Sequence, residues 1–148
     1  MSHPGPRVYG VIARNTEGGV TWSHGVEGPG EQLRAVAAAD ANTWFAVGST
    51  GATAKIFRST NFGQTWTTSY TGTGRLYAIS FGDAQTGTAV GWAPDHGAIV
   101  RTIDGGDTWT EQESGTTALL NSVSFVDANT GTAVGSDGII LRTTTGGE

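Results

Sequence analysis

Short apolar runs separated by glycine-rich polar turns recur along the whole chain. In the clearest stretch, the run LYAISF at 76–81 is followed by further runs at 88–91, 98–102 and 108–111. Runs of this length, bounded by Gly, Asp and Pro and rich in Val, Ile, Thr and aromatic residues, are typical of short β-strands. The stretch therefore predicts four antiparallel strands joined by turns.

The same pattern returns with a period of about 43 residues. Three independent markers share this spacing: a Gly-x-Thr-Trp segment, an Ala-Val-Gly segment and a leucine that starts the first strand. They fall at Trp22, Trp66 and Trp109, at Gly48, Gly91 and Gly135, and at Leu33, Leu76 and Leu120. A period of this length with four short strands in each unit is the signature of a β-propeller. A sandwich has no reason to repeat its sequence, and a β-solenoid usually has shorter coils.

We therefore expect an all-β fold of propeller blades, each with four antiparallel strands. The expected units are half a blade at 7–32, two blades at 33–75 and 76–119, and a blade without its last strand at 120–148, about 3.4 units in all. In the first unit, we expect a strand at 20–23 and a flexible linker at 25–30. The continuous apolar run Ile139-Ile140-Leu141 is typical of a strand in a sheet that is covered on both faces.

The turn before the fourth strand has a more specific sequence than the period. The stretch at 102–109, TIDGGDTW, fits the Asp-box pattern Ser/Thr-x-Asp-x-Gly-x-Thr-Trp, and related stretches stand at 59–66, 15–22 and 143–148. We expect the acidic or amide side chain to accept backbone N–H groups, the Gly to take positive φ, and the Trp to pack against the blade. The structural box residues are Asp104, Gly106, Thr108 and Trp109, then Asn61, Gly63, Thr65 and Trp66, then Glu17, Gly19, Thr21 and Trp22.

These boxes resemble those of the BNR/Asp-box repeat propellers, and the blades are most similar to the photosystem II stability/assembly-factor-like family. The resemblance covers about 7–148 and includes the stretch LNSVSFVD at 120–127. It implies a propeller fold, a protein partner and a location outside the cytoplasm or in the thylakoid lumen. Asp boxes are structural in many unrelated proteins, so the resemblance is specific for fold rather than for function.

Composition and charge exclude several classes of function. The chain has 148 residues, a net charge of −5 and a single lysine, Lys55, which argues against a nucleic-acid partner. It has no cysteine, so disulfides, thiol nucleophiles and cysteine metal sites are excluded. No apolar run is long enough to insert into a membrane, and residues 1–10 hold no secretory signal, so the compartment stays undetermined.

No catalytic, cofactor or metal site is expected. Among Asp-box proteins, sialidases use an arginine triad and a tyrosine nucleophile, but their Phe/Tyr-Arg-Ile-Pro motif is missing. Tyr77 has no carboxylate beside it, and its counterparts in the other units are Arg34 and Asn121. His3, His24 and His96 lie in three different units without ligand spacing. We therefore predict that the protein is not an enzyme.

An arginine recurs just before each box, and two interpretations are open. In the structural one, the arginine stacks on a tryptophan or bonds carbonyls at the ends of strands. In the functional one, the arginines form a positive rim that contacts a partner protein. The arginines are Arg14, Arg58, Arg101 and Arg142.

The stretch 92–97, WAPDHG, is predicted to be a longer loop than its counterpart at 136–138. Trp92 beside His96 could stack on a sugar ring, which would make the protein a lectin. The alternative is an ordinary surface loop, with Trp92 packed on the adjacent blade.

The leading hypothesis is a non-catalytic protein-interaction and assembly scaffold, with a sugar-binding propeller as the alternative. A designed or excised propeller fragment that self-assembles is a third interpretation. Because the last unit lacks a fourth strand that the first unit contains, we predict a homodimer of about twice 15.2 kDa. Deletion of residues 1–24 is expected to abolish this dimer.

Overall fold

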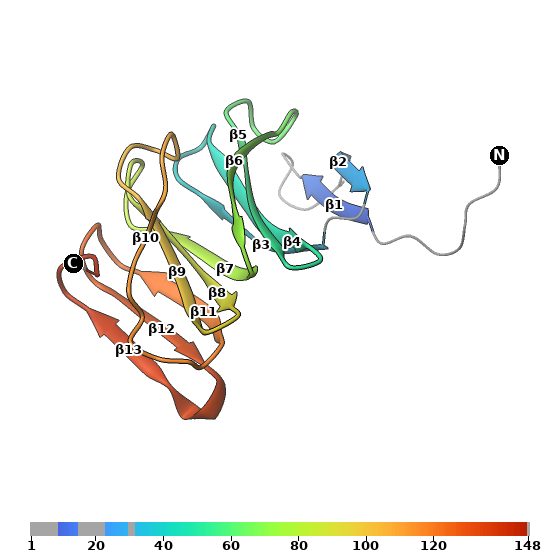
Figure 1. Ribbon diagram of the computed structural model, residues 1–148. Coiled ribbons are helices and arrows are strands. Elements are labelled where there is room, and N and C mark those ends of the chain that lie inside the picture. The colour runs from blue at the N-terminus through green and yellow to red at the C-terminus, as the bar shows by residue number, and fades with distance from the viewer. Residues whose placement is uncertain (1–8, 15–22, 30–31, 148) are drawn as a thin grey trace.

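The computed structural model describes residues 9–14, 23–29 and 32–147 of the chain. Its regular secondary structure is almost entirely β-strand, arranged as separate antiparallel sheets that follow one another along the chain (Figure 1). The first ribbon pairs β1 (Tyr9–Arg14) with β2 (Ser23–Pro29). No helix in the described part is long and apolar enough to span a membrane.

Two four-stranded sheets follow, and each is a simple meander in which strands adjacent in sequence pair. The second sheet contains β3 (Gln32–Ala38), β4 (Trp44–Thr50), β5 (Thr53–Ser59) and β6 (Thr67–Thr73). The middle sheet contains β7 (Arg75–Phe81), β8 (Gly87–Ala93), β9 (His96–Thr102) and β10 (Thr110–Glu111).

The last sheet has three strands, with the order β11-β12-β13. They are β11 (Leu120–Phe125), β12 (Gly131–Gly135) and β13 (Ile140–Thr143), with a 3₁₀ turn, η1 (Ser136–Gly138), between the last two. The prediction of an all-β fold made of four-stranded antiparallel blades is confirmed.

Two details of the predicted strands are wrong. Thr108 and Trp109 lie in the turn before β10. The backbone N–H of Thr108 is hydrogen-bonded within the box loop, and pairing with β9 begins only at Thr110. The predicted linker at 25–30 is strand as far as Pro29, since β2 pairs with β1 along this stretch.

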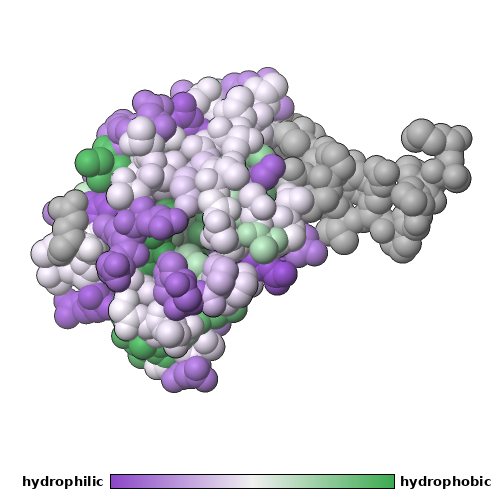
Figure 2. Space-filling model, in the orientation of Figure 1, coloured by the Kyte–Doolittle hydropathy of each residue, from purple (hydrophilic) through white to green (hydrophobic). Residues whose placement is uncertain are grey.

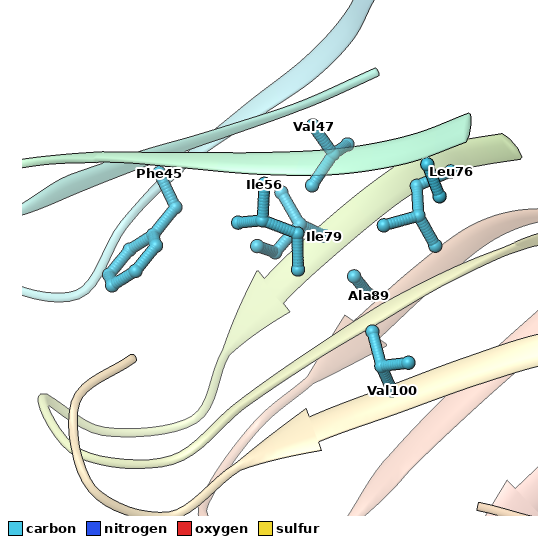
Figure 3. Packing of buried hydrophobic residues seen from close by; sticks show 8 residues of the cluster. Phe45, Val47, Ile56, Leu76, Ile79, Ala89 and Val100 are labelled. Carbon is cyan, nitrogen blue, oxygen red and sulfur yellow. The ribbon is translucent and has the colours of Figure 1, made fainter. Parts of the chain in front are cut away.

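The largest part of the core lies between the second and middle sheets. Phe45, Val47 and Ile56 of the second sheet face Leu76 and Ile79 of β7, and all five are buried (Figure 3). Burying branched and aromatic side chains in this way contributes about 1.5–3 kcal/mol per side chain. Packing of one sheet on the next, rather than pairing between sheets, therefore joins these two blades.

A second, smaller core joins the middle sheet to the last sheet. Val90 packs there with Leu120 and Ala133, and all three are buried. The expectation that the run Ile139-Ile140-Leu141 would be covered on both faces is wrong, because the side chain of Ile140 is 71% exposed. Among the described residues, no further sheet lies against this side of β13.

Each blade has a β-bulge at the same place in its first strand. The pairing shifts by one residue after Leu33, Leu76 and Leu120, each of which lies opposite the glycine of an Ala-Val-Gly marker. At Gly91, a methyl group would overlap the carbonyl oxygen of Arg75. This close approach explains why the marker ends in glycine.

Candidate functional site

The Asp box of the middle sheet is a closed hydrogen-bonded loop. The hydroxyl of Thr102 donates to Asp104 Oδ1 at 2.8 Å and accepts the N–H of Gly106 at 2.9 Å. Asp104 also accepts the backbone N–H of Thr108 at 2.9 Å and the hydroxyl of Thr108 at 2.5 Å. These donors, the Thr108 hydroxyl above all, lower the pKa of Asp104 to about 2.

The box of the second sheet has the same geometry, with an amide in place of the carboxylate. Asn61 Oδ1 accepts the N–H of Thr65 at 3.0 Å and the hydroxyl of Ser59 at 2.9 Å. Gly63 and Gly106 both have positive φ, 83° and 93° respectively. Box residues Glu17, Gly19, Thr21 and Trp22 lie outside the described residues.

The box tryptophan of the middle sheet closes the interface between two blades. The ring of Trp109 lies 5.9 Å from that of Phe45 and 6.3 Å from that of Phe81, edge to face in both cases. Its Nε1–H donates to Ser69 Oγ at 2.8 Å. Phe45 and Ser69 belong to the preceding sheet, so Trp109 binds across the interface as well as to its own blade. Trp66, by contrast, donates to Gly63 of its own box.

The repeated arginine of each blade reaches the box of the next one. Arg58 donates to the carbonyl oxygen of Gly105 at 3.0 Å and to Asp107 at 2.8 Å. Arg101, one unit later, donates to the carbonyl oxygens of Gly146 and Ala128, and it is only 8% exposed. These two arginines join neighbouring blades through carbonyl oxygens of the box loops and of the turn after β11, which leaves little of Arg101 for a partner protein.

The remaining two arginines are placed differently. Arg142, at the end of β13, is exposed on the last sheet. Arg14 ends β1, where its backbone pairs with Ser23. Arg142 therefore occupies the corresponding position of its blade on a face that no other described sheet covers.

The prediction of a long loop at 92–97 is wrong. Trp92 and Ala93 belong to β8, and His96 and Gly97 to β9, so the turn itself is only Pro94-Asp95. The guanidinium carbon of Arg75 lies 5.9 Å from the centre of the Trp92 ring, and His96 Nδ1 lies 2.5 Å from Asp95 Oδ1. Antiparallel pairing continues to the turn, so Trp92 and His96 lie in strands rather than in a long loop.

An open hollow of about 420 Å³ lies between the middle and last sheets, beside β13. Its walls include Thr88 and Gln112 of the middle sheet side, and Phe125, Leu141 and Gly147 of the last unit. No motif in the sequence marks this hollow, because it forms where two blades meet.

Two further repeated features have no counterpart among the predicted site residues. Arg34 and Tyr77 occupy the same bulged position in adjacent blades, and the guanidinium carbon lies 5.2 Å from the centre of the ring. Asp40, Asp83 and Asp127 each accept two backbone N–H groups in the turn after the first strand. Their shared spacing in the sequence marks these turns. Within the part of the chain that the structure describes, no three His, Asp or Glu side chains form a metal-binding group.

Comparison with solved structures supports the fold. A structure of YCF48 bound to D1 peptide matches with a TM-score of 0.69 and 18% identity, over 95% of this chain and 42% of that one. A structure of YCF48 from Cyanidioschyzon merolae matches with a TM-score of 0.66 and 22% identity, over 80% of this chain and 35% of that one. The chain thus spans less than half the length of either protein.

No family model matches the sequence, and no curated protein matches it. The structural matches therefore carry the comparison, and at these identities they establish architecture. The chain has the blade architecture of the YCF48 propellers, which confirms at the level of fold the resemblance to photosystem II assembly-factor propellers.

Proposed function

We propose that this chain is a non-catalytic protein-interaction and assembly module. The observation that carries the proposal is the outer face of the last sheet, defined here by Val134, Ile140 and Arg142. Val134 is 38% exposed, whereas its counterparts Val47 and Val90 are buried in the two blade interfaces. The outer face thus presents to solvent the side chains that elsewhere hold one blade against the next.

The similar propeller YCF48 supports the same class of function. Its structure was determined bound to D1 peptide, so that propeller binds a protein segment. The role proposed for this chain needs only a surface of suitable chemistry, and the outer face supplies apolar side chains beside a cation. In Figure 2, an apolar patch lies over the lower end of the last sheet.

The first partner that we propose is a second copy of the chain. The opposite end of the described blades carries Val36, the counterpart of Ile79 and Val123, and it is 54% exposed. In the middle sheet, Ile79 is the residue that packs against Val47 and Ile56 of the preceding blade. Val134 and Ile140 thus lie on the face that elsewhere packs against the following blade, and Val36 lies on the face that elsewhere packs against the preceding one. The two faces are therefore complementary, which favours a closed homodimer.

Substitution of one exposed residue tests this proposal. Ile140→Asp places a charge on the outer face and should convert the dimer to a monomer in light scattering. Val126→Asp is the matched control, because Val126 is 80% exposed but lies in the turn after β11. The proposal requires Val126→Asp to leave the mass unchanged. Equal behaviour of the two variants would contradict it.

The alternative function, a sugar-binding propeller, rests on Trp92 and His96. Stacking on a sugar needs a free aromatic face, and Arg75 lies over one face of Trp92. A glycan array tests this alternative directly. Binding that is lost in Trp92→Ala would support it, and an array without signal would remove it.

A further inference from the structure

The last sheet has an open edge next to an open hollow. Among the described strands, β13 pairs with β12 alone, whereas β5 and β9 each have a second neighbour, β6 and β10. The hollow of about 420 Å³ begins at this edge. An unpaired edge exposes backbone donors and acceptors that favour the addition of another strand.

The hollow corresponds, one unit later, to the place where Trp109 lies. Trp109 is surrounded by Phe45, Ser69 and Phe81. The counterparts of these three residues one repeat later are Thr88, Gln112 and Phe125, and all three line the hollow. The hollow thus has the position that the box tryptophan occupies in the preceding blade interface. The side chain that fits it is a tryptophan that directly precedes a fourth strand.

The first ribbon carries such a strand. In the middle sheet, Thr110 lies opposite Arg101 and Glu111 opposite Val100. In the first ribbon, Ser23 lies opposite Arg14 and His24 opposite Ala13, which is the same register. The segment before Ser23 reads Gly-Val-Thr-Trp at 19–22, outside the described residues. By sequence and by register, β2 is therefore a fourth strand of the same kind as β10.

We propose that the hollow and the edge of β13 accept residues 19–25 of a second copy of this chain, with Trp22 in the hollow and Ser23 opposite Arg142. This assignment rests on the self-association proposed above and names the segment that performs it. In the exchanged form, His24 lies opposite Leu141, as Glu111 lies opposite Val100. The backbone N–H of Gly25 then donates to Ile140, as that of Gln112 donates to Ile99 at 2.9 Å.

The exchange is favoured by the size of the sheets involved. A two-stranded ribbon is marginally stable in water, whereas a fourth strand on a three-stranded sheet extends an existing core. The strand leaves a two-stranded pairing on β1 and gains an equivalent pairing on β13. In the exchanged form, the hollow buries the indole ring of Trp22. Exchange of an identical element between copies is a common route to dimers.

Cysteine crosslinking tests the assignment, because the chain contains no cysteine of its own. Residues directly opposite in antiparallel strands have Cα atoms about 4.5–5.5 Å apart, within disulfide range. Two single variants of the full chain, Ser23→Cys and Arg142→Cys, are mixed at equal concentration and oxidised. We expect a covalent heterodimer that reducing agent dissociates. A crosslink between the two variants can form only between copies.

The matched control is the double variant Ser23→Cys with Arg14→Cys, which locks β2 on its own β1. This variant should form its disulfide within one chain and, unlike the unmodified chain, should be monomeric in light scattering. No covalent heterodimer in the mixture, while the control closes normally, would overturn the assignment. If the unmodified chain is still a dimer that Ile140→Asp disrupts, the proposed function stands and only the strand exchange fails. A monomeric unmodified chain would contradict both.

Discussion

The rings of Phe45 and Trp109 meet edge to face, with their centroids 5.9 Å apart and their planes inclined by 77°, although they belong to different sheets. Trp109 is half-buried, so its contribution lies at the low end of the range for large aromatic residues. Trp109→Ala should lower the free energy of unfolding by about 3 kcal/mol. Urea denaturation followed by circular dichroism measures the loss.

The variant Trp109→Phe separates the ring from the hydrogen bond. It keeps an aromatic contact with Phe45 and removes the bond from Nε1 to Ser69. We expect a smaller loss, of about 1 kcal/mol. If Trp109→Ala itself cost less than about 1 kcal/mol, Trp109 would not join the two blades.

Removing the buried arginine, Arg101, should destabilise the protein more than removing the more exposed arginine, Arg58. Arg101→Ala leaves the carbonyl oxygens of Gly146 and Ala128 without their charged donor, and we expect a cost of about 2–3 kcal/mol. Arg58→Ala, at the more exposed site, should cost less. Urea midpoints of the two variants give the comparison. Equal midpoints, or a larger effect at Arg58, would contradict the role of burial at these arginines.

Arg101→Lys tests whether a positive charge alone stabilises the contact between the two blades. An ammonium group cannot donate in two fixed directions as a guanidinium can, so we expect lysine to recover less than half of the loss seen in Arg101→Ala. Full recovery would mean that the position needs only a positive charge.

Gly91→Ala tests the close approach at the β-bulge. A methyl group at this position would overlap the carbonyl oxygen of Arg75, which is backbone and cannot rotate away. We expect a loss of about 1–3 kcal/mol or more, the usual cost of overpacking. Gly115→Ala is a control for a glycine with open space around it, although its own φ of 72° adds some strain. In thermal unfolding, the melting temperature of Gly91→Ala should lie well below that of Gly115→Ala.

Acid should weaken the middle Asp box. The folded-state pKa of Asp104 is about 2, below its ordinary value of 3.8, so its contribution to stability is present above pH 3.8 and is lost as the pH falls towards 2. Asp104→Asn, which reproduces the amide found at Asn61 in the preceding box, should flatten the fall in stability across this window. Urea midpoints measured from pH 7 to pH 2 report the difference.

Other carboxylates contribute in the same direction. Backbone N–H groups lower the pKa values of Asp40, Asp83 and Asp127, so some acid sensitivity persists in Asp104→Asn. If this variant and the unmodified chain lose stability in parallel below pH 4, the Asp104 carboxylate does not stabilise the box loop.

The periodic features of the fold could be predicted from the sequence because each reports a local constraint. The box spacing follows from a loop that closes on Asp104 or Asn61. The glycine of each Ala-Val-Gly marker follows from the bulge opposite it, as at Gly91. Repetition made these local signals visible three times over.

Features that depend on two blades could not be predicted in this way. The sequence shows that Arg101 recurs, but only the packing of blades places it against Gly146 of the following box. The turn after Trp92 is shorter than the loop predicted at 92–97. Strand pairing continues beyond the apolar run at 88–91 and includes His96 and Gly97. The exposure of Ile140 likewise depends on which sheets lie beside it.

The molar mass of the unmodified chain in solution, measured by light scattering at micromolar concentration, decides whether two copies associate. We predict a dimer of about twice 15.2 kDa, because we propose that the outer face and the edge of β13 bind a second copy. A folded monomer of 15.2 kDa would contradict self-association, and a trimer would contradict closure by two copies.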